Sequence, residues 1–331
     1  MWRVTSLPSP AEIRAAAARI DGFVVQTALT RSEYLSSVAG GDVYLKRECE
    51  QHTGSFKLRG ATNVLAQLTA EERAAGVVAS SAGNHGLGIA SAAHTLGIAA
   101  TIYVPASAPR IKRDKIAALG ASVHASARTY DDAESYARVA ALDSGARFVS
   151  PCTGRELLAG QGTVALEIVE QLADQGATLG TLMVCVGGGG LAGGVAGLLR
   201  AESPSTRIIG AQSELTNAMS LALASGEATD IPDLPTLADG LAGLVDDEML
   251  AQGQAALDDI VTVSEDDIAR AIQALWTHEG LTVEGGGAVG TAALMTGRVR
   301  PTAFPVVVIV SGSNIDEARH QAIVAGNFPA R

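Results

Sequence analysis

From residue 77 onward, short apolar runs alternate with longer segments in which apolar and polar positions are mixed. The runs predict buried strands, and the longer segments, several of which end at a glycine, predict helices. The strands are expected at 77–80, 99–104, 121–125, 147–149, 181–186, 207–212, 260–263 and 305–310. The helices between them are expected at 84–96, 110–119, 130–142, 160–173, 191–200 and 264–278. Such alternation is typical of parallel sheets that are covered by helices on both faces.

The segment before residue 77 carries clear helix-start signals. Ser9-Pro10-Ala11-Glu12 is a capping box with proline at the first helical position, and it predicts a helix that ends near Ile20. Thr30-Arg31-Ser32-Glu33 repeats the signal and predicts a short second helix. A strand is expected at 43–46, directly before a turn rich in glycine and serine at 53–56.

The chain is long enough for two lobes of this kind. At 331 residues it exceeds what one small core requires. We therefore predict the α/β fold class, with two doubly wound open-sheet lobes whose ligands bind at the carboxyl ends of the strands. Residues 1–65 and 151–331 are expected to form the larger lobe, and residues 66–150 a smaller lobe inserted in it.

The charge and the cysteine content limit the kinds of binding partner and the cellular location that we expect. The formal net charge is -11, from 24 basic and 35 acidic residues, and no basic block is present, which argues against nucleic acid and anionic membranes as partners. The uncharged run 181–199 is interrupted by glycines, which favours a strand, a turn and a helix over a membrane span. Cys49, Cys152 and Cys185 form neither a disulfide framework nor a zinc pattern, so we expect a reducing, cytoplasmic location.

Lys57 is the first candidate for chemistry, because it follows the turn at 53–56 and begins a segment with helical spacing. A solvated lysine is the ordinary interpretation of such a residue. A cation is, however, unfavourable at the positive end of a helix dipole, whereas a neutral amine there can attack a carbonyl carbon. A lysine that forms a Schiff base is one physical reason for this placement.

Four consecutive glycines, 187–190, lie between a predicted strand and a predicted helix. Without side chains, their N–H groups can converge on a phosphate at the start of the helix, although close packing of strand and helix is an alternative explanation. A second alternative is the dinucleotide pattern formed by Gly188, Gly190 and Gly193, with Glu214 about twenty residues further on. That interpretation, a nicotinamide-dependent dehydrogenase, gives Lys57 no role.

Three further turns follow predicted strands or begin predicted helices. Residues 80–86 combine small side chains with an amide and suit a carboxylate or phenol oxygen, although an ordinary helix start is equally consistent with them. The others are Glu284-Gly285-Gly286-Gly287 and Ser311-Gly312-Ser313-Asn314, whose hydroxyls can meet a ring nitrogen. The histidines show no metal-ligand spacing, and we expect no metal site.

Taken together, these turns resemble the fold type II pyridoxal-phosphate enzymes, which are similar to tryptophan synthase β, and within them the threonine dehydratase and serine racemase family. The resemblance runs from about Thr27 to the C-terminus. It rests on segments that match in order and spacing: Lys46-x-Glu48-x-x-Gln51-x-Thr53-Gly54-Ser55-Phe56-Lys57-x-Arg59-Gly60-Ala61, Ser81-Ala82-Gly83-Asn84-His85, Gly187 to Gly190, Glu284, and Ser311-Gly312-x-Asn314.

The resemblance implies pyridoxal 5′-phosphate as cofactor and a role for each of these residues. Lys57 would bind the cofactor as a Schiff base and later remove the Cα proton of an amino acid substrate. The other cofactor-binding residues would be Phe56, Asn84, Gly187, Gly188, Gly189, Gly190, Glu284 and Ser311, with Asn84 at the ring oxygen and Ser311 at the ring nitrogen. The substrate carboxylate would lie near Ser55, Ser81, Ala82, Asn84 and His85. The family also implies a homodimer.

The implied activity is that of an ammonia-lyase, which converts a β-hydroxy L-amino acid such as threonine or serine to a 2-oxo acid and ammonia. Ala82 occupies the position at which the racemases carry a serine, so weak or no racemisation is expected. The acidic side chains of the family's divalent-cation site correspond here to Gln212 and Asn217, with Glu214 nearby, which argues against a metal.

The substrate remains open at this stage. Gly285-Gly286-Gly287 replaces the Pro-Ser-Gly of many relatives, and the lost hydroxyl predicts a wider pocket for a larger substrate, such as a hydroxyectoine-derived amino acid, hydroxyaspartate or phenylserine. Serine racemisation and β-replacement are alternatives on the same fold. A nicotinamide-dependent dehydrogenase and a non-catalytic binding protein are the alternatives from other classes.

Overall fold

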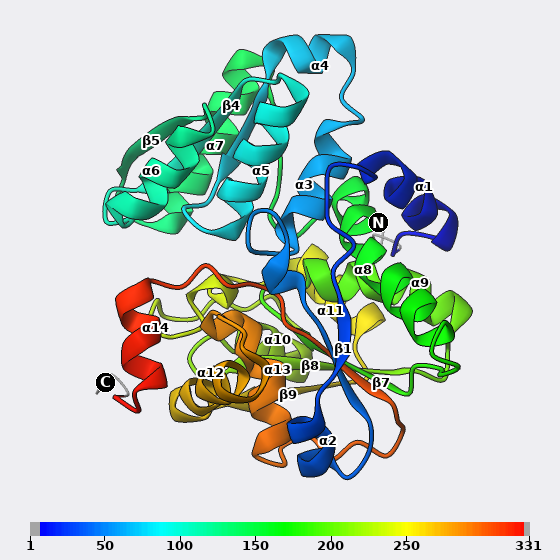
Figure 1. The fold of residues 1–331 in the computed structure, drawn as a ribbon. Helices are drawn as coiled ribbons and strands as arrows, with labels where there is room; N and C mark the ends of the chain where they lie inside the picture. The colour runs from blue at the N-terminus through cyan, green and yellow to red at the C-terminus, as the bar shows by residue number, and fades with distance from the viewer. Residues whose placement is uncertain (1–6, 328–331) are drawn as a thin grey trace.

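In the computed structural model, which describes residues 7–327, two open sheets organise the chain (Figure 1). The larger sheet has, among these residues, six strands in the order β1-β2-β10-β7-β8-β9. They are β1 (Leu29–Arg31), β2 (Val43–Lys46), β7 (Thr181–Cys185), β8 (Arg207–Ser213), β9 (Asp259–Val263) and β10 (Val306–Ile309). The pairing is parallel except at the edge, where β1 runs antiparallel to β2.

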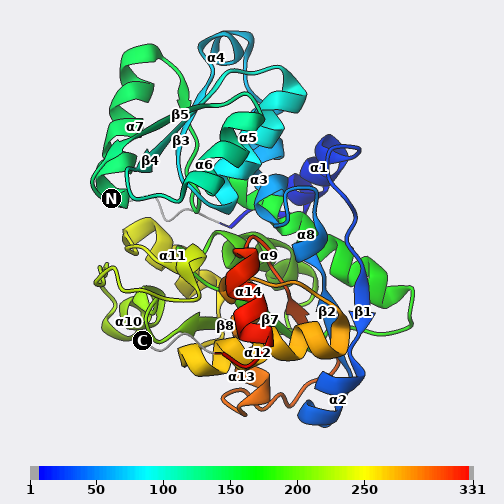
Figure 2. The same ribbon diagram turned by 60° about the vertical axis from the view of Figure 1, so that its left-hand side comes forward.

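The smaller sheet is built from one continuous part of the chain. Its four strands within the described residues lie in the order β5-β4-β3-β6 and are all parallel. They are β3 (Val77–Ser80), β4 (Ala100–Pro105), β5 (Ser122–Ala127) and β6 (Arg147–Phe148). Helices α5 (Asn84–Leu96), α6 (Arg110–Ala118) and α7 (Tyr130–Ser144) connect these strands and surround the sheet (Figure 2).

Helices cover both faces of the larger sheet, as the alternating pattern predicts. In Figures 1 and 2, α8 (Arg155–Ala173) and α9 (Gly190–Glu202) lie above the sheet, and α12 (Glu265–Glu279) and α13 (Gly285–Met295) lie below it. The other helices are α1 (Pro10–Ile20), α2 (Glu33–Ala39), α4 (Ala70–Ala75), α10 (Ala218–Ser225), α11 (Asp247–Ala256) and α14 (Glu317–Val324). None of the helices within residues 7–327 has the length and apolar composition needed to cross a membrane.

Helix α3 (Lys57–Leu65) joins the two lobes. Leu58 and Leu65 belong to the apolar core of the smaller lobe. Another face of the same helix packs so closely on α8 that a Cβ on Gly160 would stand 2.7 Å from the Cα of Gly60. Glycine at this crossing lets the two backbones approach, and the first residue of α3 is thereby fixed between the lobes.

Local signals explain most boundaries. Ser9 and Glu12 form the predicted capping box of α1, and Gly97 ends α5 in the left-handed conformation, with φ +65°. The predicted short second helix is confirmed as α2, but its capping residue is Ser32, which accepts from Leu35 N, because Thr30 lies in β1. Tertiary pairing with β2 outweighs the local signal there.

The regions outside the predicted elements also differ from expectation. Helices α10 and α11 were not predicted, and neither was the short 3-10 helix η2 (Asp239–Leu241) that lies between them. Helix α8 begins five residues before the expected start, because Gly154 turns the chain at φ +103° directly before Arg155. A second 3-10 helix, η1 (Glu48–Glu50), follows β2.

Candidate active site

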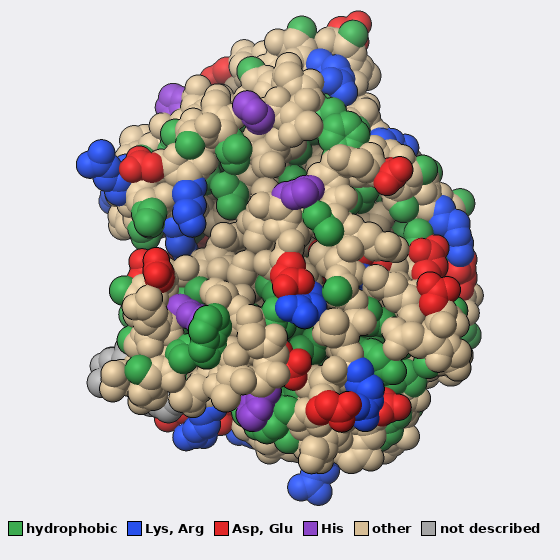
Figure 3. Space-filling view, in the orientation of Figure 1, with side chains coloured by type: hydrophobic (Ala, Val, Ile, Leu, Met, Phe, Trp, Pro, Cys, Tyr) green, Lys and Arg blue, Asp and Glu red, His purple; other side chains and the backbone are tan. Residues whose placement is uncertain are grey.

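A cleft of about 1250 Å³ lies between the two lobes, where the carboxyl ends of their strands face each other. Figure 3 shows the outline of the molecule narrowing between the upper and lower lobes on its left-hand side. The predicted site residues that line the cleft are Phe56, Lys57, Ser81, Ala82, Asn84, His85, Gly187, Gly188, Gly189, Gly190, Glu284 and Ser311. Ser55 is not among the lining residues: its side chain is buried beneath the turn, where its backbone pairs with Gly312.

Lys57 is the first residue of α3, and its amine projects into the cleft. Its Nζ donates to the carbonyl oxygen of Pro151 at 2.7 Å and lies 5.2 Å from the centroid of the Phe56 ring. Pro151 follows the last strand of the smaller sheet, whereas Phe56 leads into α3. The amine is therefore held at the junction of the lobes by one carbonyl, and a carbonyl-bearing ligand can reach it from the open side.

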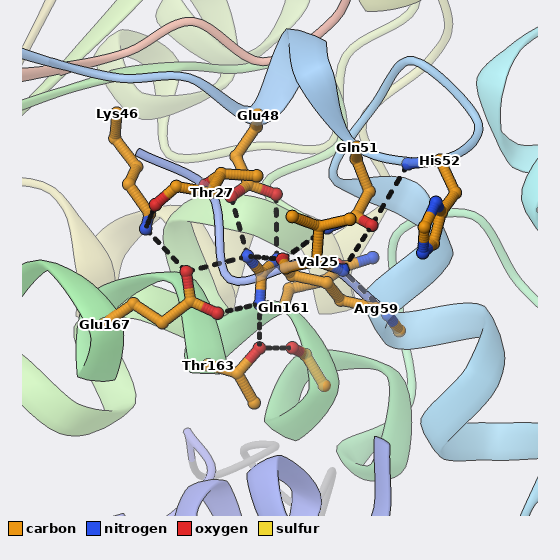
Figure 4. A network of polar contacts seen from close by, with 12 residues as sticks. Val25, Thr27, Lys46, Glu48, Gln51, His52, Arg59, Gln161, Thr163 and Glu167 are labelled. Carbon is orange, nitrogen blue, oxygen red and sulfur yellow. Dashed lines mark hydrogen bonds and ion pairs between the residues drawn. The ribbon is translucent and has the colours of Figure 1, made fainter. Parts of the chain in front are cut away.

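A buried network of charges anchors α3 two residues after Lys57 (Figure 4). The Arg59 guanidinium donates to both carboxylate oxygens of Glu48 at 2.8 Å, and to those of Glu167 at 2.6 and 2.9 Å. Lys46 donates to Glu167 at 2.5 Å. Burial alone would raise the pKa of Glu48, but the charges of Arg59 and Lys46 outweigh it and lower that pKa. The network holds two cations and two anions, and it ties β2, η1, α3 and α8 together.

The tetraglycine turn connects β7 to α9, as predicted, and leaves no room for side chains. A Cβ on Gly188 would stand 2.7 Å from Cys152 Sγ, and one on Gly190 would stand 3.0 Å from Cys152 Cα. Gly189 has φ +83°, which favours glycine. The N–H groups of the first turn of α9 have no acceptor within the helix and point to its N-terminal end. An exposed group of N–H donors at a helix start fits a phosphate.

Asn84, Glu284 and Asn314 form a hydrogen-bonded row across the cleft. Asn84 Nδ2 donates to Glu284 Oε1 at 2.6 Å, and Asn84 Oδ1 accepts from Asn314 Nδ2, also at 2.6 Å. Asn314 Nδ2 also donates to the carbonyl oxygen of Thr53 at 2.8 Å. Burial raises the pKa of Glu284 to about 7, with a further contribution from Asp239, against the hydrogen bond from Asn84. The row links three of the predicted turns.

His85 is a neutral ring rather than a cation. Burial lowers its pKa to about 3, and the charge of Lys57 acts in the same direction. Its Nε2 lies 2.9 Å from the carbonyl oxygen of Val149, and because a carbonyl only accepts, Nε2 carries the proton. Nδ1 has no partner among the described residues and is an acceptor. The His85 ring therefore offers no donor to a carboxylate, and the N–H groups of the first turn of α5 are the donors at this end of the cleft.

Ser311 follows β10 and lies near the buried thiol of Cys185, and both residues line the cleft. Burial raises the pKa of that thiol to about 11, so Cys185 is a neutral neighbour of the Ser311 hydroxyl. Sequence reasoning missed Cys185 as a cleft residue, although it lies two residues before Gly187, the first glycine of the tetraglycine segment. It also missed the ion pair that Lys112 Nζ of α6 forms with Asp239 Oδ2 at 3.0 Å, which joins the lobes. No local signal marks a pair between residues so far apart.

The comparisons with known proteins agree with this arrangement. A family model described as pyridoxal-phosphate dependent enzyme matches residues 20–312. The chain therefore belongs to the pyridoxal-phosphate-dependent enzyme family, and pyridoxal phosphate is its cofactor. This confirms the predicted cofactor and the predicted class of enzyme, and it overrules the nicotinamide interpretation, whose Glu214 is an exposed residue 3.8 Å from Arg298.

Individual relatives narrow the class further. The chain is 41% identical over 306 residues to L-threonine ammonia-lyase of Thermotoga maritima, covering 92% of this chain and 75% of that protein. It is 36% identical over 318 residues to the catabolic L-threonine dehydratase of Staphylococcus aureus, covering 95% and 91%. Among solved structures, maize serine racemase superposes with a TM-score of 0.89 at 31% identity, covering 94% and 95% of the two chains. The threonine deaminase of T.th. superposes with a TM-score of 0.86 at 32% identity, covering 93% and 99%.

Proposed function

We propose that this enzyme is an ammonia-lyase that converts threonine and serine to a 2-oxo acid and ammonia. The observation that carries the proposal is the Lys57 amine, which lies in the same interlobe cleft as the tetraglycine turn. The similarity to an L-threonine ammonia-lyase over 92% of the chain supports the reaction type.

The cleft fits the cofactor, because one end offers an amine and another offers a turn without side chains. Lys57 would hold the cofactor aldehyde, Gly187 to Gly190 the phosphate, and Phe56 one side of the ring. Asn84 and Ser311 would hold the polar atoms of the ring, with Glu284 bonded to Asn84. When bound, pyridoxal phosphate supplies an electron sink that stabilises the substrate carbanion.

The protein groups then have the following tasks. Lys57 Nζ accepts the Cα proton, and Pro151 O, with the Phe56 ring below, keeps that amine at the floor of the cleft. The N–H groups at the start of α5 bind the substrate carboxylate next to Ser81. Ser311, whose neighbour Cys185 is a neutral thiol, would offer a hydroxyl rather than a carboxylate to the ring nitrogen. A hydroxyl does not strongly favour a protonated ring, which favours prompt loss of the β-hydroxyl.

Ala82 supports elimination over racemisation. Its buried methyl group occupies the position of the second acid/base of the racemases, and a methyl group cannot return a proton to the opposite face of Cα. We expect weak or no interconversion of L- and D-serine by this enzyme, and a readily measured rate would contradict the assignment.

The glycines after Glu284 give less extra room than their sequence suggests. A Cβ on Gly285 would stand 2.1 Å from Leu237 O, and one on Gly287 would stand 2.8 Å from Gly312 O, so close backbone approaches fill both places. Gly286 lines the cleft, and a Cβ there would be 3.4 Å from Leu241. Space beside Gly286 alone would favour a larger β-hydroxy amino acid, so hydroxyaspartate and phenylserine belong in the substrate panel as a second candidate class.

Trapping tests the proposal. Borohydride reduction of the protein loaded with the cofactor, followed by peptide mapping, should label Lys57, and the Lys57→Ala variant should lose the label and 2-oxo acid release. Lys115→Ala, a lysine of the opposite cleft wall, is the matched control and should keep both. A label elsewhere, or 2-oxo acid release by Lys57→Ala at the wild-type rate, would remove the basis of the proposal.

We also propose a homodimer in the cytoplasm, with residues 66–150 moving as a smaller lobe against residues 1–65 and 151–331. The three unpaired cysteines suit a reducing compartment. The ion pair between Lys112 and Asp239 would close the lobes on each other. Analytical ultracentrifugation would test the dimer: a single species of monomer mass at micromolar concentration would contradict it.

A further inference from the structure

Gln212 ties together three pieces of chain behind the tetraglycine turn. Its side chain is fully buried near the end of β8 and does not line the cleft. Nε2 donates to Val186 O and to Thr216 O, both at 2.9 Å, and Oε1 accepts from Ser220 N at 3.0 Å. Both amide protons and the amide oxygen are therefore used, and each bond reaches a different segment.

The three partners bear on the cofactor turn. Val186 is the residue directly before Gly187, so the bond to its carbonyl fixes the entry to the phosphate turn. Ser220 lies in the first turn of α10, where the N-cap residue Asn217 forms no side-chain cap bond. Gln212 Oε1 therefore accepts from an N–H group of this turn that has no acceptor within the helix. Helix α10 in turn places Met219 Cε 3.3 Å from where a Cβ on Gly189 would stand.

The carbonyl oxygens of Val186 and Thr216 come from different turns and converge on one buried point. Together they form an electronegative pocket. Oxygen atoms in this arrangement are the ligands that Mg²⁺ and Ca²⁺ prefer. Here the pocket is filled by the amide donor of Gln212, which cannot share the position with a cation. No group of three or more His, Cys, Asp or Glu side chains that suits a metal is found within residues 7–327. Because Gln212 Nε2 already donates to Val186 O and Thr216 O, these residues do not fit the divalent cation that the family resemblance implies for this region.

We infer that Gln212 is a positioning residue that holds the phosphate turn in place of a bound cation. The carboxamide supplies the two positive contacts to Val186 O and Thr216 O that a cation would supply, and it does so without a charge. Cofactor affinity and stability of this enzyme are then independent of divalent cations and of chelators. Thr216 Oγ1, which is buried and has no partner among the described residues, leaves one more oxygen at the same point.

The Gln212→Glu variant tests the inference, because it changes one NH2 group to an oxygen. The carboxylate has no proton to donate, so three oxygens then face each other, and a divalent cation can bridge them. With EDTA, we expect the melting temperature of the cofactor-free variant and its affinity for pyridoxal phosphate to fall. With Ca²⁺ or Mn²⁺ at about 100 times its dissociation constant, the melting temperature should rise by about 5 °C. Calorimetric titration with Ca²⁺ should show one site per chain.

Gln51→Glu is the matched control. Gln51 is equally buried and donates through Nε2 to Val25 O at 2.9 Å, but only one carbonyl faces its amide. In EDTA, this variant should melt at a lower temperature than the wild-type enzyme, and added Ca²⁺ should not raise its melting temperature. The wild-type enzyme should show the same melting temperature and the same cofactor affinity in EDTA and in Ca²⁺.

Two results would overturn the inference: wild-type enzyme that gains stability from Ca²⁺, or Gln212→Glu that folds and does not respond to it. If Gln212→Glu does not fold, the Gln212→Met variant tests whether Gln212 positions the phosphate turn. That variant removes the bonds without adding charge, and its dissociation constant for pyridoxal phosphate should rise about tenfold, with no response to Ca²⁺. An unchanged dissociation constant would show that Gln212 has no positioning role. Melting of the cofactor-free chain does not depend on the substrate, so these results can be distinguished from a failure of the proposed lyase activity.

Discussion

Replacing Arg59 by methionine should expose how α3 is anchored. Arg59 is fully buried and shares its guanidinium between Glu48 and Glu167, in addition to weaker bonds to Thr163 Oγ1 and Val25 O at 3.2 Å. After Arg59→Met, Lys46 still pairs directly with Glu167, but Glu48 loses its direct ion pair and keeps only the more distant charge of Lys46. Breaking a buried pair from one side costs about 3–5 kcal/mol.

The assay is thermal unfolding at neutral pH. For a chain of this size, about 3–5 kcal/mol corresponds to a melting temperature about 4–7 °C lower. Arg14→Met is the control, because Arg14 forms its ion pair with Glu202 at the surface, with half of its side chain exposed. Solvent screens such a pair, and its loss should barely change the melting temperature.

A second substitution separates charge from packing. Glu48→Gln, added to Arg59→Met, removes the uncompensated charge and keeps an oxygen that can accept from Thr27 Oγ1 at the position of the present 2.5 Å bond. The double variant should therefore melt at a higher temperature than Arg59→Met alone. If the double variant is the less stable of the two, then lost packing rather than a stranded carboxylate causes the effect, and the electrostatic reasoning is refuted.

Two further predictions concern the cleft itself. Because the folded state raises the pKa of Glu284 to about 7, its protonated form contributes stability that is fully present below pH 4.5 and is lost as pH rises through 7. Glu284→Gln should remove that pH dependence from the free energy of unfolding, and a variant that keeps the wild-type slope would contradict the assignment. Gly188→Ala should weaken pyridoxal phosphate binding at least about tenfold, because a Cβ would stand 2.7 Å from Cys152 Sγ and 2.9 Å from Met249 Sδ. Gly286→Ala, whose Cβ would be 3.4 Å from its nearest neighbour, is the control, and equal cofactor affinity in the two variants would refute the steric explanation.

The sequence was sufficient for the architecture, because the signals that set these elements are local. The capping box at Ser9 and the glycine at 97 mark the bounds of α1 and α5, and the apolar runs mark the parallel strands. The two-lobe α/β prediction is confirmed. One failure has a clear physical reason: Thr30 has a helix-start signal, but its segment gains more by pairing with β2. A local sequence pattern does not show that pairing with a distant strand is more favourable than a helix start.

The contents of the cleft were only partly predictable for the same reason. The turns at 81–85, 187–190 and 311–314 could be assigned to one site because strand ends of a parallel sheet meet at one edge. The hydrogen bonds that connect them could not, since Asn84, Glu284 and Asn314 are far apart in the chain. The role of each residue toward cofactor and substrate stays a prediction until it is measured. His85 shows the difference: the sequence predicts its place near the cleft, but its neutral state follows from burial, and its tautomer follows from the hydrogen bond that Nε2 donates to Val149 O.

Gln212 and Arg59 both donate hydrogen bonds to buried acceptors, but Arg59 carries a charge and Gln212 does not. The comparison explains why the sequence alone does not show the importance of either residue. Arg59 brings charge to two carboxylates, so its removal leaves an anion stranded in the interior. Gln212 brings no charge to two carbonyls, so the turn that it holds carries no ion that pH or chelation can remove. In each case one acceptor is close in the sequence and another comes from a distant segment, Glu167 for Arg59 and Val186 for Gln212. The geometry of the tetraglycine turn and of α3 therefore depends on single buried donors, Gln212 and Arg59, and on the acceptors that face them. Replacing either donor by an acceptor should change the site more than the loss of an apolar contact would.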